Sequence, residues 1–286
     1  MRLKLTPLTE NLGAVVEPYE GKVVLPLSIQ TRQEIIELFK LRGVLLFRGF
    51  NFDLQEFERF ADFFGTSDAG FHPGLQGTSR DVFVGRAALG PHAELAYTPW
   101  PPDLLWFYCV HPAAQQGRTT LFDGIRFLSE LDPATRDLFL KKKLLFSQFF
   151  IPSAWQDRYG KTQPEAIALL EPYGVVVEFK GPCLFTKYVV SAIRKTKFNG
   201  LDAFVNTVVH ALDDPEFYGM TFEDGQPIPV EVENSLRAIA TRVMVPLHWQ
   251  SGDFVMVDNT RVMHGREAYE DAARLIKARH AMARFI

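Results

Sequence analysis

The chain has 286 residues, of which 47% are hydrophobic and 23% charged, and its formal net charge is −3. This composition is that of a globular protein and excludes a disordered or fibrous chain. The net negative charge argues against nucleic-acid binding, because nucleic-acid-binding domains present a basic face or stripe. Two cysteines, Cys109 and Cys183, are too few for a disulfide framework, and we find neither a signal peptide nor an apolar run of membrane-spanning length. We therefore expect a cytoplasmic protein with no nucleic-acid or membrane partner.

Helix, strand and helix are predicted in the first third of the chain. Residues 33–41 carry apolar side chains at helical spacing, and Ser28 or Thr31 can cap this helix. Residues 44–50 are typical of a short buried strand. A second helix is predicted within residues 53–65, with Asp53 as its N-cap and Gly65 as its end.

Short strands dominate the rest of the sequence. They are predicted at 81–85, 104–110, 119–123, 144–150, 175–179, 183–190, 242–249, 253–258 and 275–286, and helices at 124–143, 198–214 and 229–243. Many short strands separated by turns favour a mainly β, antiparallel double-sheet fold with flanking α-helices. The 25 phenylalanines suit such a fold, because large rings fill the space between facing sheets.

The chemistry-bearing residues begin with His92 and Glu94, which are separated by one residue. On an extended strand, residues i and i+2 point to the same face, so these two side chains can converge on one ion. His264 is the best candidate for a third ligand, because it follows a predicted strand and turn. Two imidazoles and one carboxylate form the facial triad of non-haem Fe(II) oxygenases. Taken alone, the His-x-Glu pair is equally explained as a capped turn before a strand, and His111 and His210 are assigned structural roles.

Five segments, in order along the chain, resemble the TauD/TfdA-type Fe(II)/2-oxoglutarate-dependent dioxygenases. They are RGVLLFRGFNFDLQEFERFADFFG at the N-terminal strand and helix, HAE at the ligand pair, QQGRTTLFDG at a threonine turn, WQSGDFVMVDNTRVMHGREAY at the distal histidine, and RLIKARHAMAR at the cosubstrate arginine. The distal-histidine segment is the most specific of the five. The resemblance covers most of the chain and implies a double-stranded β-helix, or jelly-roll, core.

The resemblance implies that His92, Glu94 and His264 bind Fe(II), with 2-oxoglutarate and O₂ as cosubstrates. Glu94 stands where aspartate is commoner in the family. Halogenating relatives have a small residue at this position, so the carboxylate of Glu94 argues against halogenation.

A hydroxyl and an arginine are expected to bind the far carboxylate of 2-oxoglutarate, because guanidinium meets carboxylate as a two-pronged donor. The resemblance assigns the hydroxyl to Thr119, although QQGRTT lacks the family's first glycine and the register between Thr119 and Thr120 stays open. In the family the arginine follows the distal histidine by roughly one short strand. Arg274 fits this distance from His264 best, and Arg279 is the second candidate. Surface salt bridges are expected for two further arginines, Arg266 and Arg284.

The substrate is expected to lie above the iron, beneath a lid formed around residues 146–200. The candidate contacts are His72, Tyr97, Trp100, Trp155 and Arg279, and the aromatic ones have a core role as their alternative. Residues 151–162 mix aromatics with proline, glycine and charges without a clear period, which favours a loop. No repeat or linker divides residues 1–286, so one domain is expected.

The implied activity is the oxidation, foremost hydroxylation, of an unactivated C–H bond in a small organic or amino-acid-derived metabolite, as in natural-product biosynthesis. Desaturation, epoxidation and cyclisation are alternative outcomes of the same cofactor chemistry. An alternative of another class is a non-catalytic metal- or ligand-binding jelly-roll protein. Retention of an arginine and a threonine at cosubstrate positions argues against it.

Overall fold

Two β-sheets form the centre of the molecule in the computed structural model, which describes residues 2–19, 23–67, 79–81 and 85–285. The larger sheet follows the order β1 (Leu3–Pro7), β2 (Ala14–Pro18), β3 (Val44–Phe47), β16 (Phe254–Asp258), β7 (Leu104–His111), β18 (Leu275–Ala283) and β4 (Gly65–Thr66), and β5 (Arg80–Asp81) also pairs with β18. All of its neighbours are antiparallel except β2 and β3.

The smaller sheet carries His92 and His264 on two of its strands. Its order is β15 (Met244–Leu247), β8 (Thr119–Asp123), β17 (Val262–Arg266) and β6 (Leu89–His92), with antiparallel pairing throughout. Leu121 and Leu247 of this sheet share one apolar cluster with Leu105, Val255 and Ile276 of the larger sheet. The two sheets therefore pack face to face as an open, double-sheet jelly roll, as expected.

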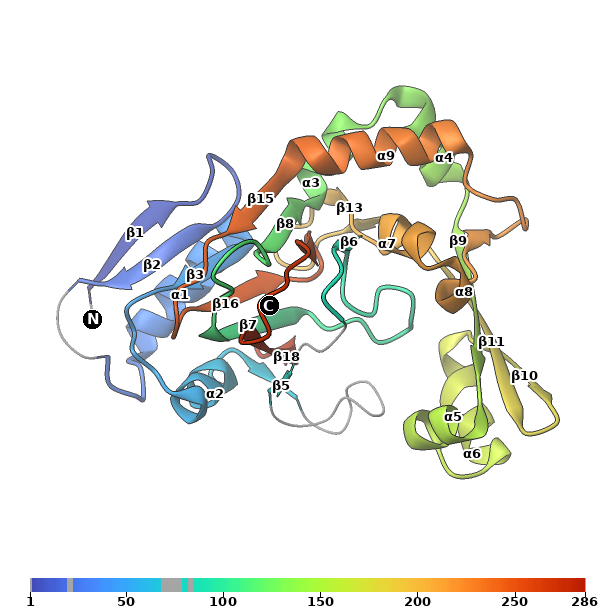
Figure 1. Ribbon diagram of the computed structural model, residues 1–286, viewed down its shortest axis with the longest axis horizontal. Helices are drawn as coiled ribbons and strands as arrows, with labels where there is room; N and C mark the ends of the chain where they lie inside the picture. Colours follow the sequence, from blue (N-terminus) through green and yellow to red (C-terminus); the bar gives the residue numbers. More distant parts are fainter. Residues whose placement is uncertain (1, 20–22, 68–78, 82–84, 286) are drawn as a thin grey trace.

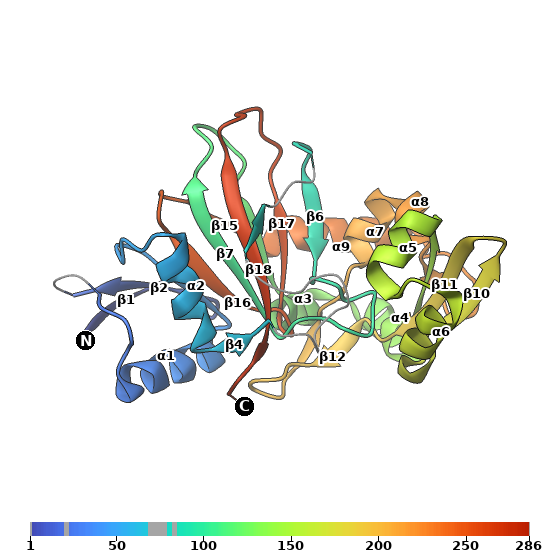
Figure 2. The ribbon, with the colours of Figure 1, turned by 90° about the horizontal axis from the view of Figure 1, so that it is seen from below.

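Helices α1 (Ile29–Arg42) and α2 (Leu54–Asp62) lie beside the larger sheet (Figures 1 and 2). The side chain of Ser28 accepts the backbone N–H of Thr31 and caps α1, and Asp53 caps α2. Gly65 does not end α2, because the helix stops at Asp62 and Gly65 begins β4.

The phenylalanines occupy a different place from the one expected. Phe47, Phe60, Trp106 and Phe254 belong to an aromatic cluster that packs residues of α1 and α2 against the larger sheet. The cluster between the two sheets is mostly aliphatic, with Phe107 as its aromatic member in the buried set. Large rings thus fill the layer between helix and sheet and not the layer between the two sheets.

The smaller sheet is covered on its other face by helices and a short hairpin. These elements are α3 (Gly124–Glu130), α4 (Pro133–Lys141), β12 (Ile193–Lys195), β13 (Asp202–Phe204), α7 (Val208–Asp213), α8 (Pro215–Tyr218) and α9 (Val230–Val243). The helix predicted at 198–214 was therefore wrong in its first half, where residues 202–204 pair as a strand with residues 193–195.

A side unit projects from this body (Figure 1). It consists of β9 (Leu144–Phe150), α5 (Pro152–Tyr159), α6 (Gln163–Leu170), a 3₁₀ turn (Glu171–Tyr173), β10 (Val176–Lys180), β11 (Cys183–Val190) and β14 (Thr221–Phe222). The loop predicted within 151–162 is largely helix α5, and Trp155 and Tyr159 anchor it in a small apolar cluster of its own. No helix in the described part of the chain has the length and apolar character that crossing a bilayer requires.

Candidate metal centre

Three side chains with metal-binding groups converge where β6 and β17 pair. His92, the last residue of β6, lies opposite His264 of β17 in the antiparallel register. A ligand atom from each of His92, Glu94 and His264 lies within 4.8 Å of the others. His264 Nε2 and Glu94 Oε2 are 3.8 Å apart. The three predicted ligands are thus brought together.

Glu94 is not in a strand with His92, as expected, but in a turn. The strand ends at His92, and Glu94 lies in the turn that follows, where Leu95 adopts a φ of 53°. Convergence therefore depends on the turn and not on the pleat of a strand that contains both ligands.

The hydrogen bonds and burial of the two imidazoles suit metal binding. His92 Nδ1 lies 3.0 Å from the carbonyl oxygen of Gly90, and donating to it leaves Nε2 as the free ligand atom. Burial, reinforced by the neighbouring His92, holds the pKa of His264 well below its usual 6.5. His264 is therefore neutral near pH 7, and a metal requires the neutral imidazole.

Asn259 fixes the backbone of Glu94. Its Oδ1 accepts the N–H of Glu94 at 2.7 Å, while its Nδ2 donates to the carbonyls of Glu94 at 3.0 Å and Pro102 at 2.9 Å. Asn259 is almost completely buried. Because it lies in the turn between β16 and β17, it connects the first ligand pair to the segment that carries His264.

The donor set fits a divalent metal. Two imidazoles and one carboxylate are the ligands of the facial triad typical of non-haem Fe(II) sites. Among the described residues, this is the only group of three or more histidine, cysteine or acidic side chains close enough to hold an ion.

Arg274 contacts the segment that leads into Thr119, the first residue of β8. Thr119 lies on the same face of β8 as Leu121, a member of the inter-sheet cluster, whereas Thr120 points to the opposite face. Arg274 Nε donates to the carbonyl of Gly117 at 2.7 Å, two residues before Thr119. The Thr119 hydroxyl accepts the indole N–H of Trp249 at 3.1 Å.

Arg274 has the properties of an anion-binding residue. It is 9% exposed, its guanidinium lies over the ring of Tyr269 at 4.8 Å, and no carboxylate of the described residues lies within 4.0 Å of it. Burial, followed by the nearby charge of Arg266, lowers the pKa of Arg274. A buried cation without a carboxylate partner favours an incoming anion, because that anion compensates its desolvation.

Arg279 binds residues of α2 instead. Its guanidinium forms an ion pair with Asp62 and donates to the carbonyl of Glu58 at 3.0 Å and the hydroxyl of Ser67 at 3.3 Å. These contacts are made with α2 and the segment after it, on the face of β18 opposite to Ile276. The structure does not bring Arg279 to Thr119, which argues against its expected cosubstrate and substrate roles.

Arg266 and Arg284, the two arginines expected in surface salt bridges, lie in different surroundings. Arg266, expected in a surface salt bridge, is 4% exposed, and it donates to the carbonyl of Ala87 at 2.7 Å and lies over Tyr269. Arg284 lies at the surface and donates to the carbonyl of Asp62 at 3.1 Å.

The expected substrate contacts separate into two groups. Tyr97 belongs to the first group: its ring contacts that of Tyr218, which in turn contacts His210, the ring stacked on His92. Trp100 contacts Tyr173 of the side unit, with ring centroids 5.0 Å apart. Trp155 is buried in the side unit, where its indole N–H donates to the carbonyl of Pro182 at 2.9 Å, so its role there is packing. His72 lies outside the described residues.

Two histidines near the ligands were missed as site residues. His280 Nε2 lies 3.8 Å from Glu94 Oε1, and the ring of His210 stacks on that of His92. Strand alternation could have found His280, because an even step along β18 separates it from Ile276, whose side chain lies between the two sheets. No pattern in the sequence pairs His210 with His92.

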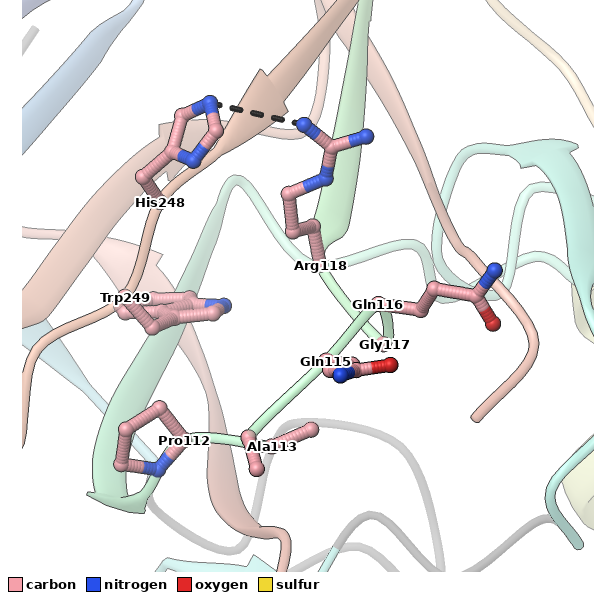
Figure 3. A pocket seen from close by; sticks show the side chains of 9 residues that line it. Pro112, Ala113, Gln115, Gln116, Gly117, Arg118, His248 and Trp249 are labelled. Carbon is pink, nitrogen blue, oxygen red and sulfur yellow. Dashed lines mark hydrogen bonds between the residues drawn. The ribbon is translucent and has the colours of Figure 1, made fainter. Parts of the chain in front are cut away.

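Two cavities lie outside the ligand cluster. One, of about 170 Å³, is lined by Pro112, Ala113, Ala114, Gln115, Gln116, Gly117, Arg118, His248 and Trp249 (Figure 3). In it, Arg118 points toward His248 at 3.5 Å and forms an ion pair with Glu267, so its charge is compensated within the protein. The other, of about 370 Å³, borders Tyr269 and Arg274. Neither is lined by the three candidate ligands.

Comparisons with known proteins agree with this geometry. The chain is 24% identical over 270 residues to the dapdiamide synthesis protein DdaC of Enterobacter agglomerans, covering 82% of this chain and 81% of that protein. It is 24% identical over 307 residues to the clavaminate synthase-like protein At3g21360 of Arabidopsis thaliana, with 92% of each covered. It is 27% identical over 182 residues to the tyrosine isonitrile desaturase of Erwinia amylovora, covering 62% of this chain and 53% of that protein.

Solved structures show the same fold. PvcB from Pseudomonas aeruginosa superposes with a TM-score of 0.66 at 18% identity, covering 98% of this chain and 91% of that chain. AAD-2, in complex with Mn(II) and N-oxalylglycine, superposes with a TM-score of 0.66 at 15% identity, covering 99% and 98%. The family model described as taurine catabolism dioxygenase TauD, TfdA family, matches residues 4–282. The chain therefore belongs to the TauD/TfdA family and is an oxidoreductase of the iron- and 2-oxoglutarate-dependent type.

Proposed function

We propose that this oxygenase oxidises, foremost by hydroxylation, an unactivated C–H bond of a small organic or amino-acid-derived metabolite. His92, Glu94 and His264 hold the Fe(II). The observation that carries the proposal is the convergence of two imidazoles and one carboxylate, with ligand atoms within 4.8 Å of one another. When bound, Fe(II) couples the oxidative decarboxylation of 2-oxoglutarate by O₂, which yields succinate and CO₂, to oxidation of the substrate.

The protein's own residues supply position and charge. Arg274 and the Thr119 hydroxyl bind the far carboxylate of 2-oxoglutarate, and the fixed fork of the guanidinium orients it. The buried surroundings of His264 exclude water and keep its imidazole neutral. Asn259 holds the backbone of Glu94 in place, so the Glu94 side chain extends toward the metal from a fixed backbone position.

The substrate is proposed to approach from the side of Tyr97, beneath the unit formed around residues 146–200. The phenol of Tyr97 stays protonated near neutral pH, because burial and Glu94 raise its pKa. It therefore offers a neutral hydrogen-bond donor next to the metal centre. Trp100 is a second contact, from the segment that meets the side unit.

Relatives named for dapdiamide synthesis and for desaturation of tyrosine isonitrile support a role in natural-product biosynthesis. The second of these names makes desaturation the second candidate outcome. A non-catalytic jelly-roll protein would have no use for a buried arginine that lacks a carboxylate partner.

The test is a screen of succinate release against amino-acid-derived metabolites, followed by mass analysis of the product. Hydroxylation adds one oxygen atom to the substrate, whereas desaturation removes a pair of hydrogens. Wild-type protein should release succinate and His264→Ala should not. Release of succinate by both proteins, or by neither, would refute the assignment of these ligands to catalysis.

A further inference from the structure

His210 lies directly against a candidate metal ligand. Its ring stacks on that of His92, with centroids 4.7 Å apart and planes 29° apart. His92 also contacts the ring of His264 at 4.2 Å. His210 belongs to α7, which packs beside β6 in both views (Figures 1 and 2).

The segment before α7 is bound to the backbone between the ligands. The carbonyl of Asn206 accepts the N–H of Ala93 at 2.8 Å, and the hydroxyl of Thr207 donates to the carbonyl of Ala93 at 3.2 Å. Ala93 separates His92 from Glu94 in the sequence. Both polar groups of this backbone unit are therefore satisfied by the two residues that precede the helix.

The helix itself is held in place from outside. Asp213, at the end of α7, forms an ion pair with Arg237 of α9 at 2.8 Å. On the β6 side the contact is close, because a Cβ at Gly90 would lie 2.6 Å from the carboxylate of Asp213. Tyr218 contacts the edge of the His210 ring, with centroids 5.5 Å apart. His210 thus has little freedom to move away from His92.

The stacked ring of His210 and the hydrogen bond to Gly90 together restrict the orientation of the His92 ring. The bond to the carbonyl of Gly90 fixes one ring nitrogen, but a single hydrogen bond still allows the ring to tilt. A flat ring stacked on its face opposes that tilt, and stacked rings attract each other beyond simple burial. We propose that His210 is a positioning residue, which holds the imidazole plane of His92 so that its Nε2 points at the metal.

The proposal rests on the proposed function, because it takes His92 to be a metal ligand. It assigns the effect to the ring and not to a hydrogen bond, since His210 Nδ1 is buried without a hydrogen-bond partner among the described residues. Residues that orient metal ligands affect metal affinity by about 10- to 100-fold when they are replaced.

The test is an anaerobic titration of the full-length metal-free protein with Co(II), followed by its visible absorption. His210→Ala and His210→Gln remove the stacked ring, and each should raise the Co(II) dissociation constant by about 10-fold. His210→Phe keeps a flat ring without nitrogen and should bind Co(II) as the wild type does. Leu212→Ala, on the same helix, controls for general loosening of α7, and the thermal midpoint of each metal-free variant is measured alongside.

Wild-type Co(II) affinity in both His210→Ala and His210→Gln would overturn the proposal. It would also be overturned if His210→Phe lost as much affinity as His210→Ala, because the nitrogen would then be the important group. A loss in Leu212→Ala equal to that in His210→Ala would assign the effect to helix packing. Failure of wild-type protein to bind Co(II) would instead refute the metal site itself, so the two failures are distinguishable.

Discussion

Replacing Arg274 with alanine should weaken the binding of 2-oxoglutarate while leaving the fold intact. In the ligand-free protein, the guanidinium makes a hydrogen bond to the carbonyl of Gly117 and lies over Tyr269, but no carboxylate of the described residues lies within 4.0 Å of it. Alanine removes that hydrogen bond, at about 1–2 kcal/mol, and also relieves the desolvation of a buried cation. The two effects oppose each other, so little change in the thermal midpoint is expected.

The effect on 2-oxoglutarate is much larger. Truncating one partner of a buried, hydrogen-bonded charge pair costs roughly 2–5 kcal/mol. At about 1.4 kcal/mol per tenfold, this is a rise of roughly 30-fold to several thousand-fold in the dissociation constant. Arg274→Lys keeps the charge but loses the two-pronged geometry, and should give an intermediate value.

The assay is isothermal calorimetry of 2-oxoglutarate binding to the protein loaded anaerobically with Mn(II). The matched control is Thr120→Ala, because Thr120 points away from the inter-sheet face, whereas Thr119→Ala should weaken binding. Unchanged affinity in Arg274→Ala with intact metal binding would refute the reasoning, as would an equal loss in Thr120→Ala.

Three further substitutions test residues whose roles the structure distinguishes. Arg279→Ala should lower the free energy of unfolding by about 1–3 kcal/mol, because the hydrogen bonds of Arg279 and its ion pair with Asp62 are lost. Its affinity for 2-oxoglutarate, measured by calorimetry, should stay unchanged. Weakened 2-oxoglutarate binding in a folded variant would show that Arg279, and not Arg274, binds the cosubstrate. Asn259→Ala leaves the buried N–H and carbonyl of Glu94 without their partners, so both the thermal midpoint and Co(II) affinity should fall, and an unaltered Co(II) affinity would contradict its role in holding the ligand. Trp155→Ala should cost about 3–5 kcal/mol in chemical denaturation as a core truncation, and a wild-type denaturation curve combined with lost substrate binding would restore the expected pocket role.

The convergence of the three candidate ligands could be predicted from the sequence, because two ligand-type side chains one residue apart and a distinctive distal segment are local patterns. The direction of the Arg279 side chain could also be predicted. Arg279 is three residues from Ile276 on β18, and an odd step along one strand puts side chains on opposite faces. The direction of Arg279 toward α2, away from the inter-sheet residue Ile276, therefore follows from the period of β18. The position of Arg274 does not, because Arg274 precedes the strand and the register shifts between Leu275 and Ile276.

Other features depend on contacts between distant segments, which no local pattern encodes. His210 and His92 meet because α7 packs on β6, and the sequence around His210 predicts only a helix. The position of the aromatic cluster outside the double sheet depends on which helices cover which face. In the same way, the turn at Glu94 is held by hydrogen bonds from Asn259, which lies far along the chain.

The most direct test of the central claim is an anaerobic titration of the protein with Fe(II) in the presence of 2-oxoglutarate, followed by visible absorption. If His92, Glu94 and His264 hold the iron and leave positions for the cosubstrate, the wild type should develop a weak charge-transfer band. The band should be absent in His92→Ala and His264→Ala. A wild type without the band, or a band that persists in either variant, would contradict the account.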